Sequence, residues 1–118
     1  MIDKLHRTIN SLLKKHYTIE FYTDNNHVII LSFYHLNSVY NGLVYIHKES
    51  GYINVDFQYH TLNKAVCEQV KRIAENVYKL YKLNQFNMAI LILNSYKPAA
   101  TEIFNNYYSI KMRKYAEV

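Results

Sequence analysis

The chain has 118 residues, 50% of them hydrophobic and 19% charged, with a formal net charge of +5 at pH 7. This length gives one domain that can bury a core without a disulfide or a metal, and the single cysteine, Cys67, excludes an intramolecular disulfide and a cysteine zinc cluster. Because no apolar run is long enough for a signal peptide or a membrane span, the sequence predicts a soluble cytoplasmic protein.

The first half of the chain predicts one helix followed by antiparallel strands. Apolar residues recur at helical spacing over 2–15: Ile2, Leu5, Ile9, Leu12 and Leu13. The pattern of apolar and polar residues then predicts strands over four ranges: 17–22, 27–35, 43–48 and 52–59. A turn at Asp24-Asn25-Asn26 joins the first two strands. Glu49-Ser50-Gly51 joins the last two, and Gly51 is expected to adopt a positive φ.

The second half predicts a long helix, a buried strand and a final helix. Thr61 is suited to cap the long helix, whose apolar stripe is Leu62, Val66, Val70, Ile73, Val77 and Leu80. The apolar run 88–93 is typical of a strand buried on both faces, and parallel pairing with 52–59 makes the long helix a right-handed crossover. Pro98 suits the first turn of the last helix, whose stripe is Ala100, Ile103, Phe104, Tyr107, Tyr108, Met112 and Tyr115.

These elements predict an α+β fold with a single domain spanning residues 1–118. The expected architecture is a mostly antiparallel five-stranded sheet packed by three helices, in the order α-β-β-β-β-α-β-α. No linker, internal repeat or low-complexity segment divides the chain.

Charge is divided between the predicted sheet and the predicted helices. Residues 17–59 contain four acids and one cation, whereas residues 1–16 and 60–85 together contain nine cations and three acids. Basic helices can neutralise the phosphates of DNA or double-stranded RNA. Lysines that merely solvate the backs of helices are the competing explanation. The cations expected to contact nucleic acid are Lys14, Lys15, Lys64, Lys71, Arg72, Lys111, Arg113 and Lys114.

No catalytic motif is present, so the chain is expected not to be an enzyme and to need no cofactor. It contains neither His-Glu-x-x-His nor Gly-x-Ser-x-Gly, and two glycines are too few for a phosphate-cradling loop. His35, His47 and His60 can approach one another across the sheet, but separate histidines are expected and no metal site is predicted. Near the start of the long helix, Cys67 fits an activated thiol or an inert buried one, and the inert thiol is the default.

One pair of residues in the last helix has the spacing of a nuclease motif. Tyr108 and Lys111 are similar to the tyrosine and lysine of rolling-circle replication nucleases. Those enzymes also need a His-x-His strand that holds a metal, and this sequence has none. Nuclease activity is therefore not expected.

Tyrosine is abundant, and several strands are apolar on both sides. With 13 tyrosines, the chain has more aromatic surface than its helices are expected to cover. Uncovered apolar patches usually mark interfaces, and tyrosine suits them because it buries a rigid ring while its hydroxyl stays wet. The residues expected to contact a partner are Tyr22, Tyr34, Tyr40, Tyr52, Tyr107 and Tyr108. A homodimer is the simplest use of such a surface.

The order of helix, antiparallel sheet and helix resembles two families. It occurs in double-stranded RNA-binding domains, and Asp24-Asn25-Asn26-His27 lies where their Gly-Pro-x-His loop would lie. Asn63-Lys64-Ala65 lies near their lysine-rich helix start, with one lysine in place of a cluster and no Gly-Pro. In architecture over Met1 to Leu83, and in composition, the chain also resembles small phage anti-CRISPR inhibitors of type II effectors. The positive charge argues against DNA mimicry.

Two functional hypotheses follow. The first, which the resemblance to the phage inhibitors also implies, is a non-enzymatic phage or mobile-element protein that binds a host or defence protein through its tyrosine-rich surface. The second is a nucleic-acid-binding regulator that uses the basic helices.

Overall fold

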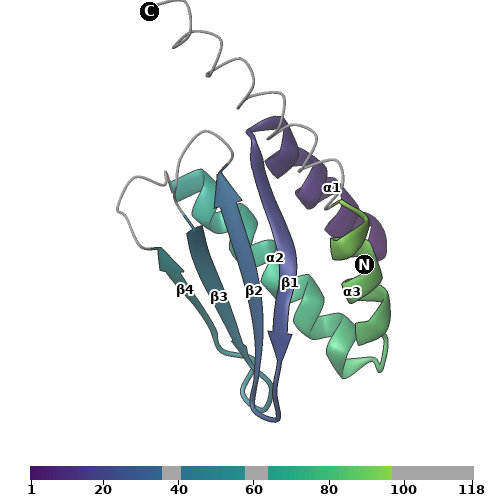
Figure 1. Cartoon of the computed structure of the whole chain (residues 1–118). Helices are drawn as coiled ribbons and strands as arrows, with labels where there is room; N and C mark the ends of the chain where they lie inside the picture. Colours follow the sequence, from purple (N-terminus) through teal and green to yellow (C-terminus); the bar gives the residue numbers. More distant parts are fainter. Residues whose placement is uncertain (36–40, 58–63, 97–118) are drawn as a thin grey trace, which may run out of the picture.

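The computed structural model describes residues 1–35, 41–57 and 64–96, which build one sheet and three helices (Figure 1). In chain order the elements are α1 (Ile2–Lys14), β1 (Tyr17–Asp24), β2 (Val28–His35), β3 (Asn41–His47), β4 (Ile53–Phe57), α2 (Lys64–Lys82) and α3 (Phe86–Ser95). The strands form an antiparallel meander in the order β1-β2-β3-β4. The predicted α+β class, with an antiparallel sheet and three helices, is confirmed.

The turns at the lower end of the sheet in Figure 1 have the chemistry that the sequence predicts. Asn25 Oδ1 accepts hydrogen bonds from the backbone N–H groups of His27, at 2.9 Å, and Val28, at 2.7 Å, which closes the β1–β2 turn. Between β3 and β4, Gly51 has a φ of +73° and donates its N–H to the His47 carbonyl at 2.8 Å. The positive φ predicted for Gly51 is confirmed.

One face of the sheet and the facing stripes of the helices form the core. The strands contribute Ile19, Ile29, Leu31, Phe33, Val44 and Ile46. The helices contribute Leu5, Ile9, Leu12, Val66, Val70, Ile73, Ala74, Val77, Leu80, Ala89, Ile92 and Leu93. Burying one such large side chain contributes roughly 1.5–3 kcal/mol. This gain fixes which face of the sheet meets the helices, because a register shift of one residue would turn the apolar set outward.

A close contact between Phe33 and Gly42 shapes the core near the end of β2. The two residues pair across β2 and β3. A Cβ added at Gly42 would lie 1.9 Å from Cζ of the Phe33 ring. The ring therefore occupies the space that any larger side chain at this position would need.

α1 and α2 pack antiparallel behind the sheet. Gln69, near the start of α2, donates from Nε2 to Oγ of Ser11, near the end of α1, at 2.6 Å. α2 ends where Asn84 adopts a left-handed φ of 56°, and the Gln85 N–H bonds to the Leu80 carbonyl at 2.7 Å. The chain then reverses into α3.

The prediction of a strand over residues 88–93 is wrong, because this run lies within α3. Its core-facing residues recur at helical spacing: Ala89, Ile92 and Leu93. Leu91, by contrast, is 69% exposed and Met88 44% exposed. An apolar run of this length fits a buried strand and a helix equally well by periodicity. The solvated outer side of α3 is apolar too, and that hides the helical period.

The short connection before α3 explains where this segment packs. Residues 83–85 alone separate α2 from α3, so α3 folds back along α2. Phe86 is the first residue of α3. The centroid of its ring lies 5.8 Å from the ring centroid of Phe21 on β1 and 5.9 Å from that of Tyr81 on α2. α3 thereby joins the helical layer beside β1.

Two further predictions are corrected as a result. Within the described part of the chain, the sheet has four strands instead of five, and the observed order is α-β-β-β-β-α-α. The parallel crossover to 52–59 is not formed. The predicted helix beginning at Pro98 lies outside the described residues, as do Thr61 and Leu62 at the predicted start of the long helix.

Candidate functional site

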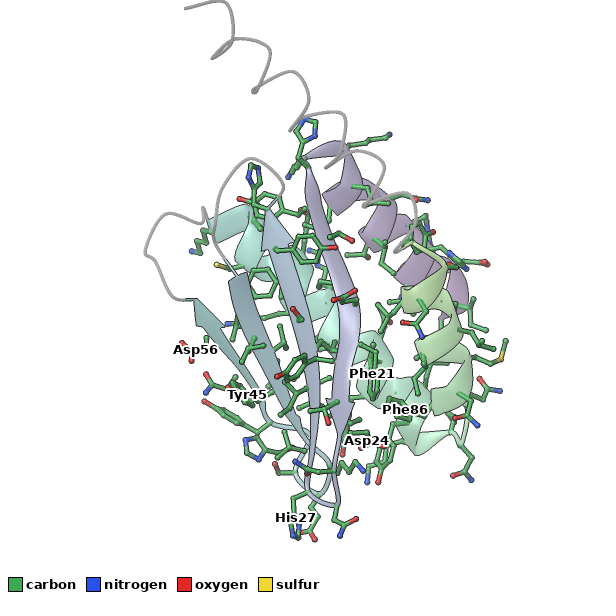
Figure 2. All side chains as sticks on the ribbon, in the orientation of Figure 1. Phe21, Asp24, His27, Tyr45, Asp56 and Phe86 are labelled. Atoms are coloured by element: carbon green, nitrogen blue, oxygen red, sulfur yellow. The ribbon has the colours of Figure 1, made fainter. Side chains whose placement is uncertain are left out.

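The face of the sheet opposite the helices is the first candidate surface. Successive residues of a strand point to opposite sides, so the strand residues that do not enter the core point away from the helices. This outer face includes Thr18, Glu20, Thr23, Val28, Ile30, Ser32, Tyr34, Leu43, Tyr45, His47, Asn54 and Asp56. Figure 2 shows Tyr45 on the side of the sheet turned to the reader. None of α1, α2 and α3 lies over this side.

The centre of the outer face is apolar. Ile30 pairs with Tyr45 across β2 and β3, and Val28 and Leu43 lie on the same face of these two strands. All of these side chains are half-buried. Apolar and aromatic groups gathered in this way are typical of protein interfaces.

The predicted partner-binding tyrosines do not form one cluster. Tyr22, at a β-bulge in β1, and Tyr52, beside the β3–β4 turn, are each 62% exposed, whereas Tyr34 is half-buried at the opposite end of β2. Three others lie outside the described residues: Tyr40, Tyr107 and Tyr108. Sequence analysis did not single out Tyr45, although its alternation with Val44 and Ile46 in β3 already places it on the outer face.

Carboxylates border the outer face. Glu20 and Asp56 are its charged residues. Lys48 is the single lysine or arginine of residues 17–57. Its side chain lies on the helical side of the sheet, where Nζ is 2.6 Å from Asp24 Oδ1 and faces the ring of Tyr81 on α2. The outer face therefore combines an apolar centre with an acidic edge.

A second candidate site is a groove between α1 and α2, with a volume of about 450 Å³. We call it the cationic groove, after its exposed charged residues: Lys4, Arg7, Arg72, Glu75 and Lys79. The rest of its lining is polar and less exposed: Thr8, Ser11, Gln69 and Asn76. None of the four cations forms an ion pair with a carboxylate of the described residues.

Asn76 is the most buried of the residues that line the cationic groove. Its side chain is 8% exposed and shares a helix face with Ile73 and Leu80. The amide makes no hydrogen bond to any described residue, whereas Gln69 and Ser11 in the same lining bond to each other. Unpaired amides at this depth are uncommon in folded proteins.

The predicted nucleic-acid contacts only partly match the cationic groove. Arg72 lines it. Four other predicted cations are exposed but do not line it: Lys14 at the end of α1, Lys15 directly after it, and Lys64 and Lys71 on α2. Lys111, Arg113 and Lys114 lie outside the described residues.

Sequence analysis missed most of the groove: Lys4, Arg7, Lys79 and Asn76. One signal was available for Asn76, because it stands three residues after Ile73 and four before Leu80. That spacing belongs to the buried stripe of an amphipathic helix, where an apolar residue is expected.

The histidines and Cys67 do not assemble a chemical site. In residues 1–35, 41–57 and 64–96, no group of three or more His, Cys, Asp or Glu could hold a metal ion. The ring centroid of His35 lies 4.4 Å from that of Tyr17 and 6.5 Å from that of His16. Burial lowers the pKa of His35, and His16 lowers it further. His60 lies outside the described residues.

Burial raises the pKa of Cys67, more than the nearby Lys71 lowers it. The thiol therefore stays protonated near neutral pH. The raised pKa argues against an activated nucleophile, although the side chain is half-buried and not fully buried as the inert thiol was expected to be.

Comparison with known proteins gives no match: no protein-family model, no curated protein and no solved structure corresponds to this chain. Among the described helices, none has the length and apolar character needed to cross a bilayer. Functional inference therefore depends on the outer face and the cationic groove.

Proposed function

We propose that this chain is a non-enzymatic binding protein whose outer face docks another protein. The observation that supports the proposal is the position of the helices. All three pack on one face of the sheet, so Ile30, Leu43 and Tyr45 remain half-exposed on the other. Removing these apolar groups from water supplies association energy, and the rigid strands hold them in place before binding.

The acidic edge indicates what kind of partner fits. Asp56 is exposed beside the apolar centre, and no lysine or arginine of the described residues lies on the outer face. A partner with an apolar centre and Lys or Arg at its edge is complementary in charge. We therefore favour a different protein over a second copy of this face, which would be acidic itself.

The source and effect expected from the sequence are part of the same proposal. The partner would be a host or defence protein, and binding would inhibit or modulate it in the manner of a phage or mobile-element protein such as an anti-CRISPR inhibitor. The identity of the captured partner tests this part separately.

A photo-cross-linking amino acid at position 45 tests the docking surface. In cells that produce the protein, we expect one defined adduct from position 45 and none from position 71, which is exposed on α2. Ile30→Glu should abolish the adduct without changing the circular dichroism spectrum, because it places a charge in the apolar centre.

Three results would contradict the proposal. Adducts of equal yield from positions 45 and 71 would show non-specific contact. The absence of any adduct from position 45 would remove the docking surface. A self-adduct, together with a dimer mass by light scattering, would assign the outer face to the predicted homodimer.

Nucleic-acid binding by the basic helices is the second candidate, and the charge of α1 and α2 favours it. Residues 1–15 hold four cations and residues 64–82 hold five, against three acids in both ranges together. Affinity for a duplex would then fall steeply as salt rises, because each phosphate contact releases counterions. Absence of binding to DNA and to double-stranded RNA at low salt would remove this candidate.

A further inference from the structure

We propose that the cationic groove binds a small molecule that carries a phosphate group. This goes beyond the docking of a protein on the outer face, because the groove lies in the helical layer. The inference depends on three properties of the groove: an excess of positive charge, a buried amide that has no hydrogen-bond partner among the described residues, and size.

The charge of the groove selects an anion. Lys4 and Arg7 from α1 and Arg72 and Lys79 from α2 line the cationic groove, and Glu75 is the single carboxylate among the described residues of this lining. The lining therefore has an excess of three positive charges. Like charges along the lining of one groove repel one another, and a multiply charged anion bound among them reduces that repulsion. Arginine also offers paired N–H groups whose geometry matches phosphate oxygens.

Asn76 indicates that the ligand has polar groups besides its charge. The amide is 8% exposed, lines the cavity and has no hydrogen-bond partner among the described residues. An amide offers both donors and an acceptor. A ligand that hydrogen-bonds to it would supply the partner that residues 1–35, 41–57 and 64–96 do not provide.

The size and polarity of the groove limit the ligand further. A volume of about 450 Å³ falls in the range of small-molecule sites. Most such sites are lined by apolar side chains, whereas every residue of this lining is polar or charged. The groove therefore suits a compact, strongly hydrophilic phosphate ester of roughly nucleotide size, and it does not suit an apolar ligand.

Isothermal titration calorimetry on the full chain tests the site, with inorganic phosphate, pyrophosphate, a nucleoside monophosphate and a ten-residue oligonucleotide as probes. We expect the monophosphate or pyrophosphate to bind with a defined stoichiometry of one per chain. Lys79→Ala should weaken that binding about tenfold, the size expected when one charge-assisted hydrogen bond is lost. Lys71→Ala is the matched control, because Lys71 is exposed on the same helix but does not line the groove.

Asn76→Leu keeps the shape of the side chain and removes its polar atoms. We expect this substitution to weaken the binding of the nucleoside monophosphate while the protein stays folded. Urea unfolding of each variant confirms that the fold persists.

Several outcomes would overturn the proposal. Equal losses from Lys71→Ala and Lys79→Ala would mean diffuse attraction without a site. Unchanged affinity for the nucleoside monophosphate in Asn76→Leu would mean that the amide does not contact the ligand, which contradicts the proposed site. Tight binding of the oligonucleotide alone, with no binding of the small probes, would favour the nucleic-acid candidate instead. None of these results depends on whether the outer face docks a protein, so the two proposals fail independently.

Discussion

Replacing Asn76 by leucine should make the protein more stable. Asn76 is 8% exposed on the α2 face that carries Ile73 and Leu80, and its amide has no hydrogen-bond partner among the described residues. A buried polar group without a partner costs about 1–3 kcal/mol. Leucine has the same branched shape, so the substitution removes this cost without leaving a cavity. Because the amide lines the cationic groove, where water can meet part of its hydrogen-bonding capacity, we expect the free energy of unfolding to rise by about 1 kcal/mol.

Gln69→Leu is the matched control. Gln69 also lines the cationic groove, but its Nε2 donates to Ser11 Oγ at 2.6 Å. Its replacement should lower the free energy of unfolding by about 0.5–1.5 kcal/mol, the usual worth of one such hydrogen bond. Urea unfolding followed by circular dichroism measures both variants, at unchanged m-value. A loss of stability in Asn76→Leu as large as that in Gln69→Leu would refute the reasoning, because it would mean that the amide has a partner.

Three further predictions concern the fold. Gly42→Ala should lower the free energy of unfolding by about 1–3 kcal/mol in the same assay, because the Phe33 ring occupies the space of the new Cβ; a neutral effect would contradict that contact. Leu91→Lys should change stability by less than about 0.5 kcal/mol, and Leu93→Lys should unfold the protein, because Leu91 is 69% and Leu93 0% exposed; equal damage would favour the strand over α3. The pKa of His35 in the folded protein is lowered from 6.5. As the pH falls, the imidazole is therefore protonated in the unfolded chain before it is protonated in the folded one. Stability should therefore fall as the pH drops below about 6.5, and His35→Gln should remove that part of the decline in pH-dependent urea unfolding; an unchanged decline would contradict it.

Alternation and turn chemistry predicted the sheet well. Residues 53–57 alternate apolar and polar side chains next to a turn with a glycine at positive φ, and the structure has β4 and Gly51 there. These signals are local, so they predict the strand and the turn without knowledge of the tertiary fold. The run 88–93 lacks such a signal, because apolar residues on every side erase both the helical and the strand period. The three-residue connection 83–85 decides between the two only once the end of α2 is known.

The candidate sites were less predictable because they depend on pairs of elements. Tyr45 becomes central only when β2 and β4 are known to flank β3, and tyrosine content alone pointed to Tyr22 and Tyr52, which lie at the periphery. Lys79 enters a groove only because α1 packs antiparallel against α2. Single-sequence reasoning counts charges along each helix, but it does not show which of them face another element.

Hydroxyl-radical footprinting of the tyrosines tests the central claim most directly. In the isolated protein, at a concentration where light scattering gives a monomer, Tyr45 on the outer face should be modified, more slowly than the 62% exposed Tyr22. In the complex with the partner captured from position 45, Tyr45 should become protected while Tyr81, on the helical side, keeps its rate. Protection of Tyr45 in the isolated monomer, or an equal rate with and without the partner, would contradict the assignment of the outer face as a docking surface.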